Sequence, residues 1–106
     1  MISLVVALLL SSNYQCSGEA PRGAYQVPLS IQAKGDNYFL TWGDGTLVGL
    51  GVLQGNQLAV SFVDMKSGGL GVILYEIKGG QLFGRWAVGD GKFYQESCMA
   101  GPTSKA

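Results

Sequence analysis

The chain has 106 residues, of which 47% are hydrophobic and 13% charged, and its formal net charge is zero. This length allows one domain and excludes two, and the apolar content excludes a disordered charged tail. The seven basic residues are scattered singly along the chain. Nucleic acids and anionic membranes bind clustered positive charge, so the composition indicates neither partner.

The first 20 residues differ in character from the rest. The run 2–10 is apolar apart from Ser3 and is followed by polar residues. Such a run is too short to span a bilayer but suits the hydrophobic region of a secretory signal, although no basic residue precedes it. We therefore expect a leader over 1–20, one β domain over 21–100 and a flexible tail over 101–106, in a secreted or periplasmic protein without a membrane span. The alternative for the apolar run is a buried first strand.

Two cysteines, Cys16 and Cys98, flank the region of expected strands. A small exported domain is stabilised by a disulfide that closes a long loop, so a bond between them is one expectation. Two unpaired cysteines are another. A third reading makes Cys16 a lipidated residue, but Gln15 and Asn13 do not match the small and aliphatic residues that lipidation requires before the cysteine.

Short apolar runs separated by turn residues predict an all-β fold. The expected strands are 25–34, 37–43, 46–54, 57–63, 70–78, 81–89 and 92–98. Five of the connections are two-residue pairs suited to hairpin turns, namely Gly35-Asp36, Asp44-Gly45, Gly55-Asn56, Gly79-Gly80 and Asp90-Gly91. We expect an antiparallel up-and-down meander of about seven strands, curled into a small barrel. The segment 64–69 is the one longer connection expected.

A two-residue turn fixes which residues lie opposite each other. The predicted partners are Leu29 with Trp42, Leu40 with Gly49, Gly49 with Phe62, Tyr75 with Gly84, Trp86 with Gln95 and Arg85 with Glu96. This register gathers most large apolar residues on one face. The other face carries a second apolar set, comprising Phe39, Val48, Leu50, Val52, Val63 and Phe83. Either the fold buries both faces or this set contacts another molecule.

The order of these motifs resembles a family of small secreted bacterial domains labelled fibronectin-binding proteins. The shared features over roughly 23–98 are Trp42, Gly49-x-Gly51, Gly55-Asn56, Gly71-Val72 with Tyr75, Gly80-x-Leu82-x-Gly84-x-Trp86, and Glu96. The resemblance implies a secreted β domain that binds protein. The sequence departs from the family in a shorter first hairpin and in Phe93-Tyr94-Gln95 before the glutamate, and both departures put a shared ligand in doubt.

Few residues are suited to catalysis. The chain has no histidine, which excludes Ser-His-Asp and Cys-His nucleophiles and histidine metal ligands, and it has no Cys-x-x-Cys motif. Asp36, Asp44 and Asp90 occupy turn positions that aspartate favours for local reasons. We therefore expect no enzyme, no cofactor and no metal.

One polar cluster is predicted on the face away from Trp86. The register sets Arg85 opposite Glu96 and diagonal to Glu76. The simpler interpretation is a solvated group of cross-strand ion pairs. The alternative is a polar spot that orients a partner.

The sequence favours a non-enzymatic secreted or periplasmic binding module, adhesion-like in binding an extracellular or envelope protein. Its expected contact surface is the loop that contains Asp64, Met65, Lys66 and Ser67, because loops on a rigid scaffold often carry function. Alternatives are a secreted enzyme inhibitor and a carrier of calycin type with a pocket among Tyr25, Tyr38, Trp42, Tyr75 and Trp86. Against the carrier, a barrel this small is expected to be filled by its own side chains.

Overall fold

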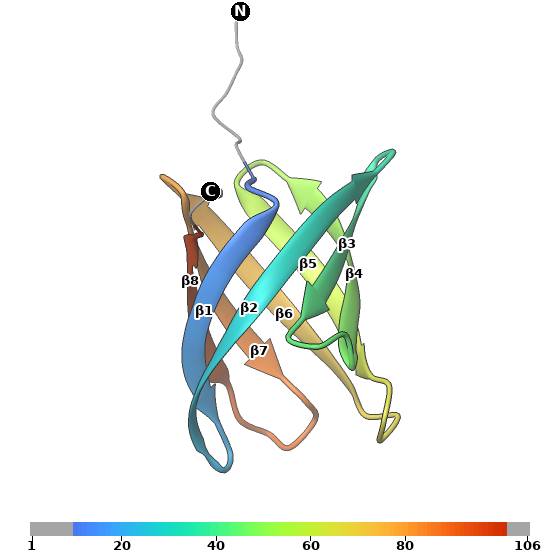
Figure 1. The fold of residues 1–106 in the computed structure, drawn as a ribbon. Coiled ribbons are helices and arrows are strands. Elements are labelled where there is room, and N and C mark those ends of the chain that lie inside the picture. Colours follow the sequence, from blue (N-terminus) through green and yellow to red (C-terminus); the bar gives the residue numbers. More distant parts are fainter. Residues whose placement is uncertain (1–9, 102–106) are drawn as a thin grey trace, which may run out of the picture.

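Eight antiparallel strands follow one another along the chain and form a closed barrel (Figure 1). The computed structural model describes residues 10–101. The strands are β1 (Asn13–Ala20), β2 (Gly23–Lys34), β3 (Asn37–Trp42), β4 (Leu47–Gln54), β5 (Gln57–Asp64), β6 (Leu70–Lys78), β7 (Gln81–Ala87) and β8 (Tyr94–Ala100). The all-β meander and its curling into a small barrel are confirmed. Within the described range there is no helix long and apolar enough to cross a membrane.

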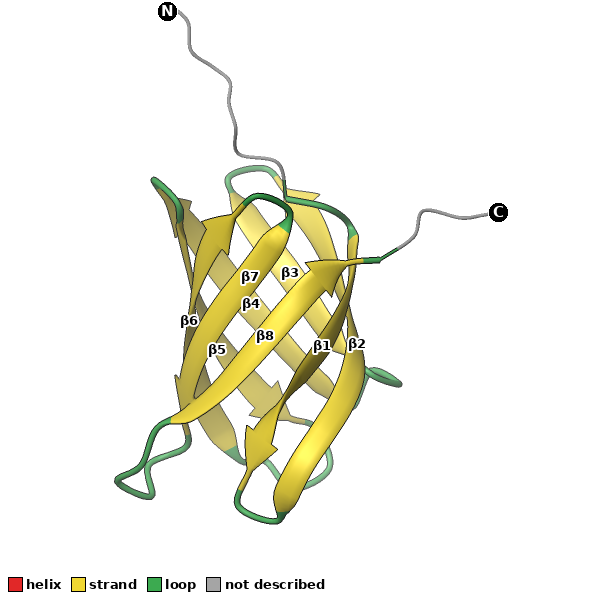
Figure 2. Cartoon of the chain, turned by 90° about the vertical axis from the view of Figure 1, so that its left-hand side faces the viewer, coloured by secondary structure: helices red, strands yellow, loops and turns green. Residues whose placement is uncertain are grey.

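The barrel closes where β1 pairs with β8 (Figure 2). β1 was not among the predicted strands, because 1–20 was assigned to a leader. The structure corrects this boundary: Asn13–Ala20 pairs with β2 on one side and with β8 on the other, and residues 21–22 form the turn into β2. The rest of the expected leader, up to residue 9, and the tail from residue 102 lie outside the described residues.

Four of the five predicted turns give the predicted pairing. Leu29 lies opposite Trp42, Leu40 opposite Gly49, and Tyr75 opposite Gly84. The turn glycines have the left-handed backbone that such hairpins need, with φ values of 61° at Gly35 and 60° at Gly55. Turn chemistry therefore fixes the register from β2 to β5 and between β6 and β7.

The prediction for Asp90-Gly91 is wrong by one residue. β7 ends at Ala87 and β8 begins at Tyr94, so a six-residue connection (88–93) replaces the expected two-residue turn. The Asp90 carboxylate accepts a hydrogen bond from the backbone N–H of Lys92 (3.1 Å) and another from the Tyr94 hydroxyl, which together shape this loop. Trp86 consequently pairs with Tyr94, and Glu96 pairs with Gly84 instead of Arg85. A shift of one residue turns every side chain of β8 to the other face.

The interior has two different halves. The end of the barrel that carries the β2–β3, β4–β5 and β6–β7 turns (upper in Figure 1) is filled by buried apolar side chains. These are Tyr14, Cys16, Leu29, Ile31, Leu40, Leu58, Ile77, Leu82 and Cys98. The opposite half is open.

Candidate functional site: a cavity at the open end of the barrel

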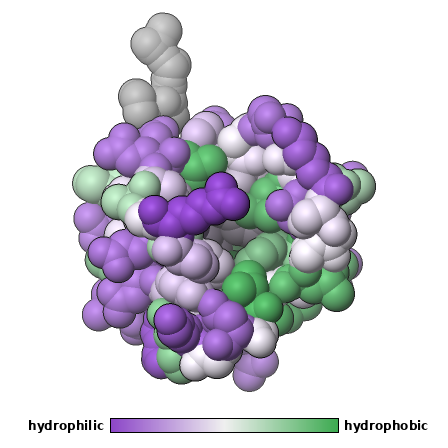
Figure 3. Space-filling model, turned by 90° about the horizontal axis from the view of Figure 1, so that it is seen from below, coloured by the Kyte–Doolittle hydropathy of each residue, from purple (hydrophilic) through white to green (hydrophobic). Residues whose placement is uncertain are grey.

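A cavity of about 910 Å³ occupies the lower half of the barrel. Seen from below, it appears as a hollow with hydrophobic atoms on part of its wall (Figure 3). Its volume is in the range of pockets that hold small molecules. Its walls include Tyr25, Val27, Trp42, Leu47, Phe62, Ile73, Trp86 and Glu96. The expectation that the barrel would be filled by its own side chains is therefore wrong for this half.

Interior glycines make room for the aromatic side chains around the cavity. A Cβ atom built on Gly18 would lie 2.6 Å from the Tyr25 hydroxyl oxygen, and one on Gly84 would lie 2.8 Å from the Tyr75 ring. Phe62 lies against Gly71 of the neighbouring strand. Because each ring passes over a position without a side chain, it can reach across the strands toward the barrel axis.

Four of these rings form a connected wall. The centroids of Trp42 and Phe62 are 5.9 Å apart, those of Phe62 and Trp86 6.3 Å, and those of Trp86 and Tyr25 6.4 Å. Each pair meets edge to face, the arrangement that aromatic quadrupoles prefer. Tyr94 lies beside Trp86 at 4.7 Å. The rings therefore pack against one another, with Trp42 buried and Tyr25, Phe62 and Trp86 half-buried.

Glu96 is the one buried charged side chain among the described residues, with 4% of its surface exposed. Its Oε1 accepts a hydrogen bond from the Tyr25 hydroxyl at 2.7 Å. Its Oε2 accepts one from the Tyr75 hydroxyl and a longer one, 3.4 Å, from the Trp42 indole N–H. These donors come from β2, β3 and β6, so the carboxylate of β8 ties four strands together across the barrel.

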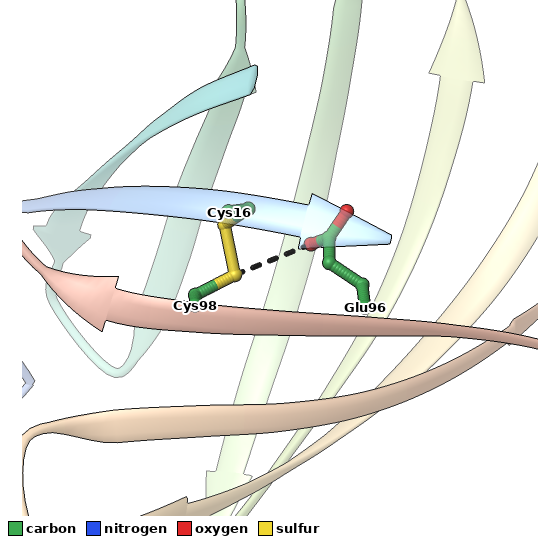
Figure 4. A group of neighbouring side chains, drawn as sticks. All are labelled: Cys16, Glu96 and Cys98. Carbon is green, nitrogen blue, oxygen red and sulfur yellow. Dashed lines mark hydrogen bonds between the residues drawn. A yellow bond between two sulfur atoms is a disulfide. The ribbon is translucent and has the colours of Figure 1, made fainter. Parts of the chain in front are cut away.

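A disulfide between Cys16 of β1 and Cys98 of β8 lies directly beside Glu96 (Figure 4). Cys98 Sγ is 3.4 Å from Glu96 Oε2. A disulfide sulfur has no proton, so this contact adds no donor to the carboxylate. The three side chains are close enough to share a metal ion, with candidate ligand atoms within 4.8 Å. The disulfide, however, removes the thiolates that a metal would need.

The two tyrosines that hold Glu96 stay protonated. Burial and the negative carboxylate raise the pKa of Tyr75 well above its usual value. Burial and the hydrogen bond to Glu96 raise the pKa of Tyr25 as well. Both hydroxyls are therefore fixed as donors toward the carboxylate at all physiological pH values.

Trp86 has a polar atom that finds no partner among the residues that the structure describes. Its indole nitrogen is buried, and no acceptor within the described chain lies in hydrogen-bond geometry to it. The nearby indole N–H lowers the pKa of Tyr25, but burial and Glu96 raise that pKa by more. A buried donor without an acceptor costs free energy. Since Trp86 lines the cavity, a bound molecule can supply the missing acceptor.

The rim of the cavity carries two aspartates, Asp44 and Asp64. Backbone N–H groups donate to both carboxylates, from Thr46 to Asp44 and from Lys66 and Ser67 to Asp64. These bonds lower the pKa of each aspartate, so both are ionised at neutral pH. The rim is therefore negative, with Lys66 as the basic residue that acts on both carboxylates.

The predicted partner-binding loop belongs partly to this rim. Asp64 and Ser67 line the cavity, whereas Met65 is 65% exposed and points to neither cavity nor core. Internal hydrogen bonds hold the loop, including Gly68 N–H to the Asp64 carbonyl at 2.7 Å. It is also not the one longer connection, because 43–46 and 88–93 exceed two residues as well.

The predicted polar cluster of Glu76, Arg85 and Glu96 does not form. The one-residue shift of β8 moves Glu96 into the barrel, away from the outward-facing pair. Glu76 accepts a hydrogen bond from Asn56 Nδ2 at 3.5 Å, and the Arg85 guanidinium lies over the Phe93 ring, 4.5 Å from its centroid. Glu96 is thus the central site residue, and the sequence placed it on the wrong face.

A signal for the correct placement was present. Tyr94, Glu96 and Cys98 alternate along the strand, and Cys16 with Cys98 can bond only if both face the same way. A cross-strand disulfide at Cys98 therefore requires Glu96 to face inward.

The sequence matches no model of a known protein family and no curated protein. The resemblance to fibronectin-binding domains therefore remains a prediction.

Proposed function

We propose that this chain is a non-enzymatic binding protein, exported from the cell, that holds a small molecule in the open end of its barrel. The observation that carries the proposal is the cavity of about 910 Å³ inside an otherwise well-packed barrel. Protein interiors are normally filled to crystal-like density, and small-molecule sites are concave and lined mainly by apolar and aromatic side chains, so this cavity is suited to hold a ligand.

Two features of the wall support a ligand over mere empty space. The Trp86 N–H is buried without an acceptor among residues 10–101, and a ligand oxygen or uncharged nitrogen would supply one. The aromatic wall is held in place by edge-to-face contacts and by glycines, so its shape exists before binding. A preformed wall reduces the ordering cost of binding.

The test uses an uncharged fluorophore, N-phenylnaphthylamine, whose emission rises in apolar surroundings. We expect saturable, one-to-one binding. The chain's two tryptophans, Trp42 and Trp86, both line the cavity, so their intrinsic fluorescence should change in the same titration.

The matched variants are Val27→Phe and Val52→Phe. Val27 lines the cavity, whereas Val52 is exposed on the outer wall. The added ring at Val27 fills ligand space and should weaken binding by about tenfold or more, which corresponds to about 1.4 kcal/mol. Val52→Phe should leave the dissociation constant unchanged. Equal binding by both variants, or no saturable binding by the native chain, would contradict the proposal.

The outer wall offers a second candidate, contact with another protein molecule. Exposed apolar residues lie in two rows across β4, β5 and β6: Leu50 and Val72 flank Ser61, and Val52 and Leu74 flank Ala59. Because Ser61 and Ala59 of β5 are small, a shallow groove runs along β5 between the larger side chains of β4 and β6. A contiguous exposed apolar surface is a frequent feature of protein interfaces.

Sedimentation of the purified chain over a wide concentration range tests this candidate on its simplest partner, a second copy. We expect reversible dimers that the paired change Leu50→Lys and Val72→Lys abolishes. The matched pair Gln32→Lys and Gln57→Lys, at exposed polar positions, should leave the dimers intact. A monomer at every concentration would remove self-association as the role of this wall.

A further inference from the structure

We infer that the ligand is an organic cation: an amine, protonated at neutral pH, whose ammonium group binds Glu96 and whose largely apolar body packs against the aromatic wall and carries an uncharged acceptor atom for the Trp86 N–H. This inference rests on the proposed function and names its ligand class. It depends on three observations, which concern the charge of Glu96, the acceptor it leaves free and the composition of the walls.

The first observation is a buried negative charge, Glu96, that has no positive partner in the described part of the chain. The groups that contact the Glu96 carboxylate are two tyrosine hydroxyls, the Trp42 N–H and a disulfide sulfur. No lysine or arginine belongs to the cavity lining, as far as residues 10–101 show. Buried charges in proteins are normally paired or bind a cation. A cationic ligand would supply the pairing that the chain does not.

The second observation is a vacant acceptor position. A carboxylate offers about four lone-pair sites. Oε2 receives Tyr75 and Trp42, while Oε1 receives Tyr25 alone among the described residues. Because Glu96 lines the cavity, an N–H group of a ligand can reach the free position on Oε1. Charge-assisted hydrogen bonds of this kind are among the strongest in proteins.

The third observation is the character of the approach. Asp44 and Asp64 give the rim negative charge, and beyond them the ligand meets the faces and edges of Trp42, Phe62 and Trp86. Aromatic faces attract cations, tryptophan most strongly. A carboxylate-lined entrance also concentrates cations and repels anions. A bare metal ion would use little of a cavity this large, so an organic cation fits the site better.

The experiment compares three probes that share one body and differ in charge at pH 7: phenylpropylamine, phenylpropanol and phenylpropionate. Dissociation constants come from calorimetry and from the fluorescence of Trp42 and Trp86. We expect the amine to bind tightest and the carboxylate weakest. The advantage of the amine over the alcohol should be on the order of ten- to a hundredfold, as for hydrogen bonds to charged groups.

The variant Glu96→Gln keeps the size of the side chain and one acceptor oxygen but removes the charge. Its affinity for phenylpropylamine should therefore fall to that for phenylpropanol. Glu76→Gln on the outer wall is the matched control and should keep the native order. If Glu96→Gln fails to fold, the three probes on the native chain still show whether the site prefers a cation. Equal affinities, or tightest binding by phenylpropionate, would overturn the cationic ligand while the proposed function stands. If neither the probes nor N-phenylnaphthylamine bind, both proposals fail.

Discussion

At the scale of single residues, the site requires a position without a side chain, Gly18. Gly18 lies between Tyr25 and Glu96 in the barrel wall, paired with the first on β2 and with the second on β8. A Cβ there would also lie 2.4 Å from the Gln95 carbonyl oxygen. Any other residue at this position would push Tyr25 away, so the glycine permits the hydrogen bond that positions the carboxylate.

The Tyr75 hydroxyl gives a prediction about pH. Removing it in Tyr75→Phe leaves a buried carboxylate with one donor fewer, so the free energy of unfolding at pH 7 should fall by about 1–3 kcal/mol. The difference in unfolding free energy between the native chain and Tyr75→Phe should then become smaller at alkaline pH. In the native protein the raised pKa keeps Tyr75 protonated, whereas in the unfolded chain it ionises near pH 10. The stabilising effect of this group is thus complete below about pH 10 and is lost as the pH rises from there, by about 1.4 kcal/mol per pH unit.

Urea unfolding of the native chain and Tyr75→Phe, followed by circular dichroism between about pH 8 and pH 11, measures this difference. The comparison cancels the titration of lysines, which both proteins share. A stability gap that stays constant across this range would show that Tyr75 ionises equally in both states, contrary to its burial against Glu96.

At the scale of strands, local turn chemistry and long-range pairing were predicted with different success. Dipeptides that contain glycine gave the correct register from β2 to β5. The loops Gly35-Asp36 and Gly55-Asn56 have two residues and leave the partners no freedom, and the four-residue connection 43–46 keeps the same pairing. The loop before β8 has the same kind of dipeptide, Asp90-Gly91, yet it is six residues long. The Asp90 side chain holds this loop through Lys92 and Tyr94, and β8 is also paired and disulfide-bonded to β1. The dipeptide by itself contains neither contact.

β1 shows why a strand can escape prediction altogether. Its sequence, NYQCSGEA, contains no β-branched residue, and its inward positions after Tyr14 and Cys16 are Gly18 and Ala20. Polar and non-polar residues do alternate along it, but the inward residues after Cys16 are small and the segment follows the apolar run 2–10, so it was assigned to a leader. Tertiary contacts with β2 and β8 make this segment a strand, and they are not visible in the sequence.

The candidate site could be predicted only in part for the same reasons. The aromatic side chains Tyr25, Trp42, Tyr75 and Trp86 were assigned to one inner face, which the register of their own hairpins ensures. Glu96, which accepts hydrogen bonds from Tyr25, Trp42 and Tyr75, was assigned to the outer face because its strand was shifted by one residue. Whether the interior would be filled or hollow depends on the exact reach of each side chain, which periodicity does not contain.

At the scale of the whole molecule, the barrel joins a packed half to an open half, and the disulfide stands at their boundary. Cys16 and Cys98 are buried in the packed core, and Cys98 also contacts Glu96 at the floor of the cavity. The bond connects the first and last strands, which are 82 residues apart in the sequence. It therefore fastens the seam on which closure of the barrel depends.

Loss of this bond should destabilise the entire fold. Closing so long a loop strongly restricts the unfolded chain. The double variant Cys16→Ser and Cys98→Ser should therefore have a free energy of unfolding about 2–5 kcal/mol lower than the native chain. Urea unfolding with and without a thiol reductant measures the effect. Reductant should destabilise the native chain slowly, because both sulfurs are buried and β1 must first separate from β8, and it should leave the double variant unchanged. Native and double-variant chains of equal stability would show that the β1–β8 ladder alone closes the barrel.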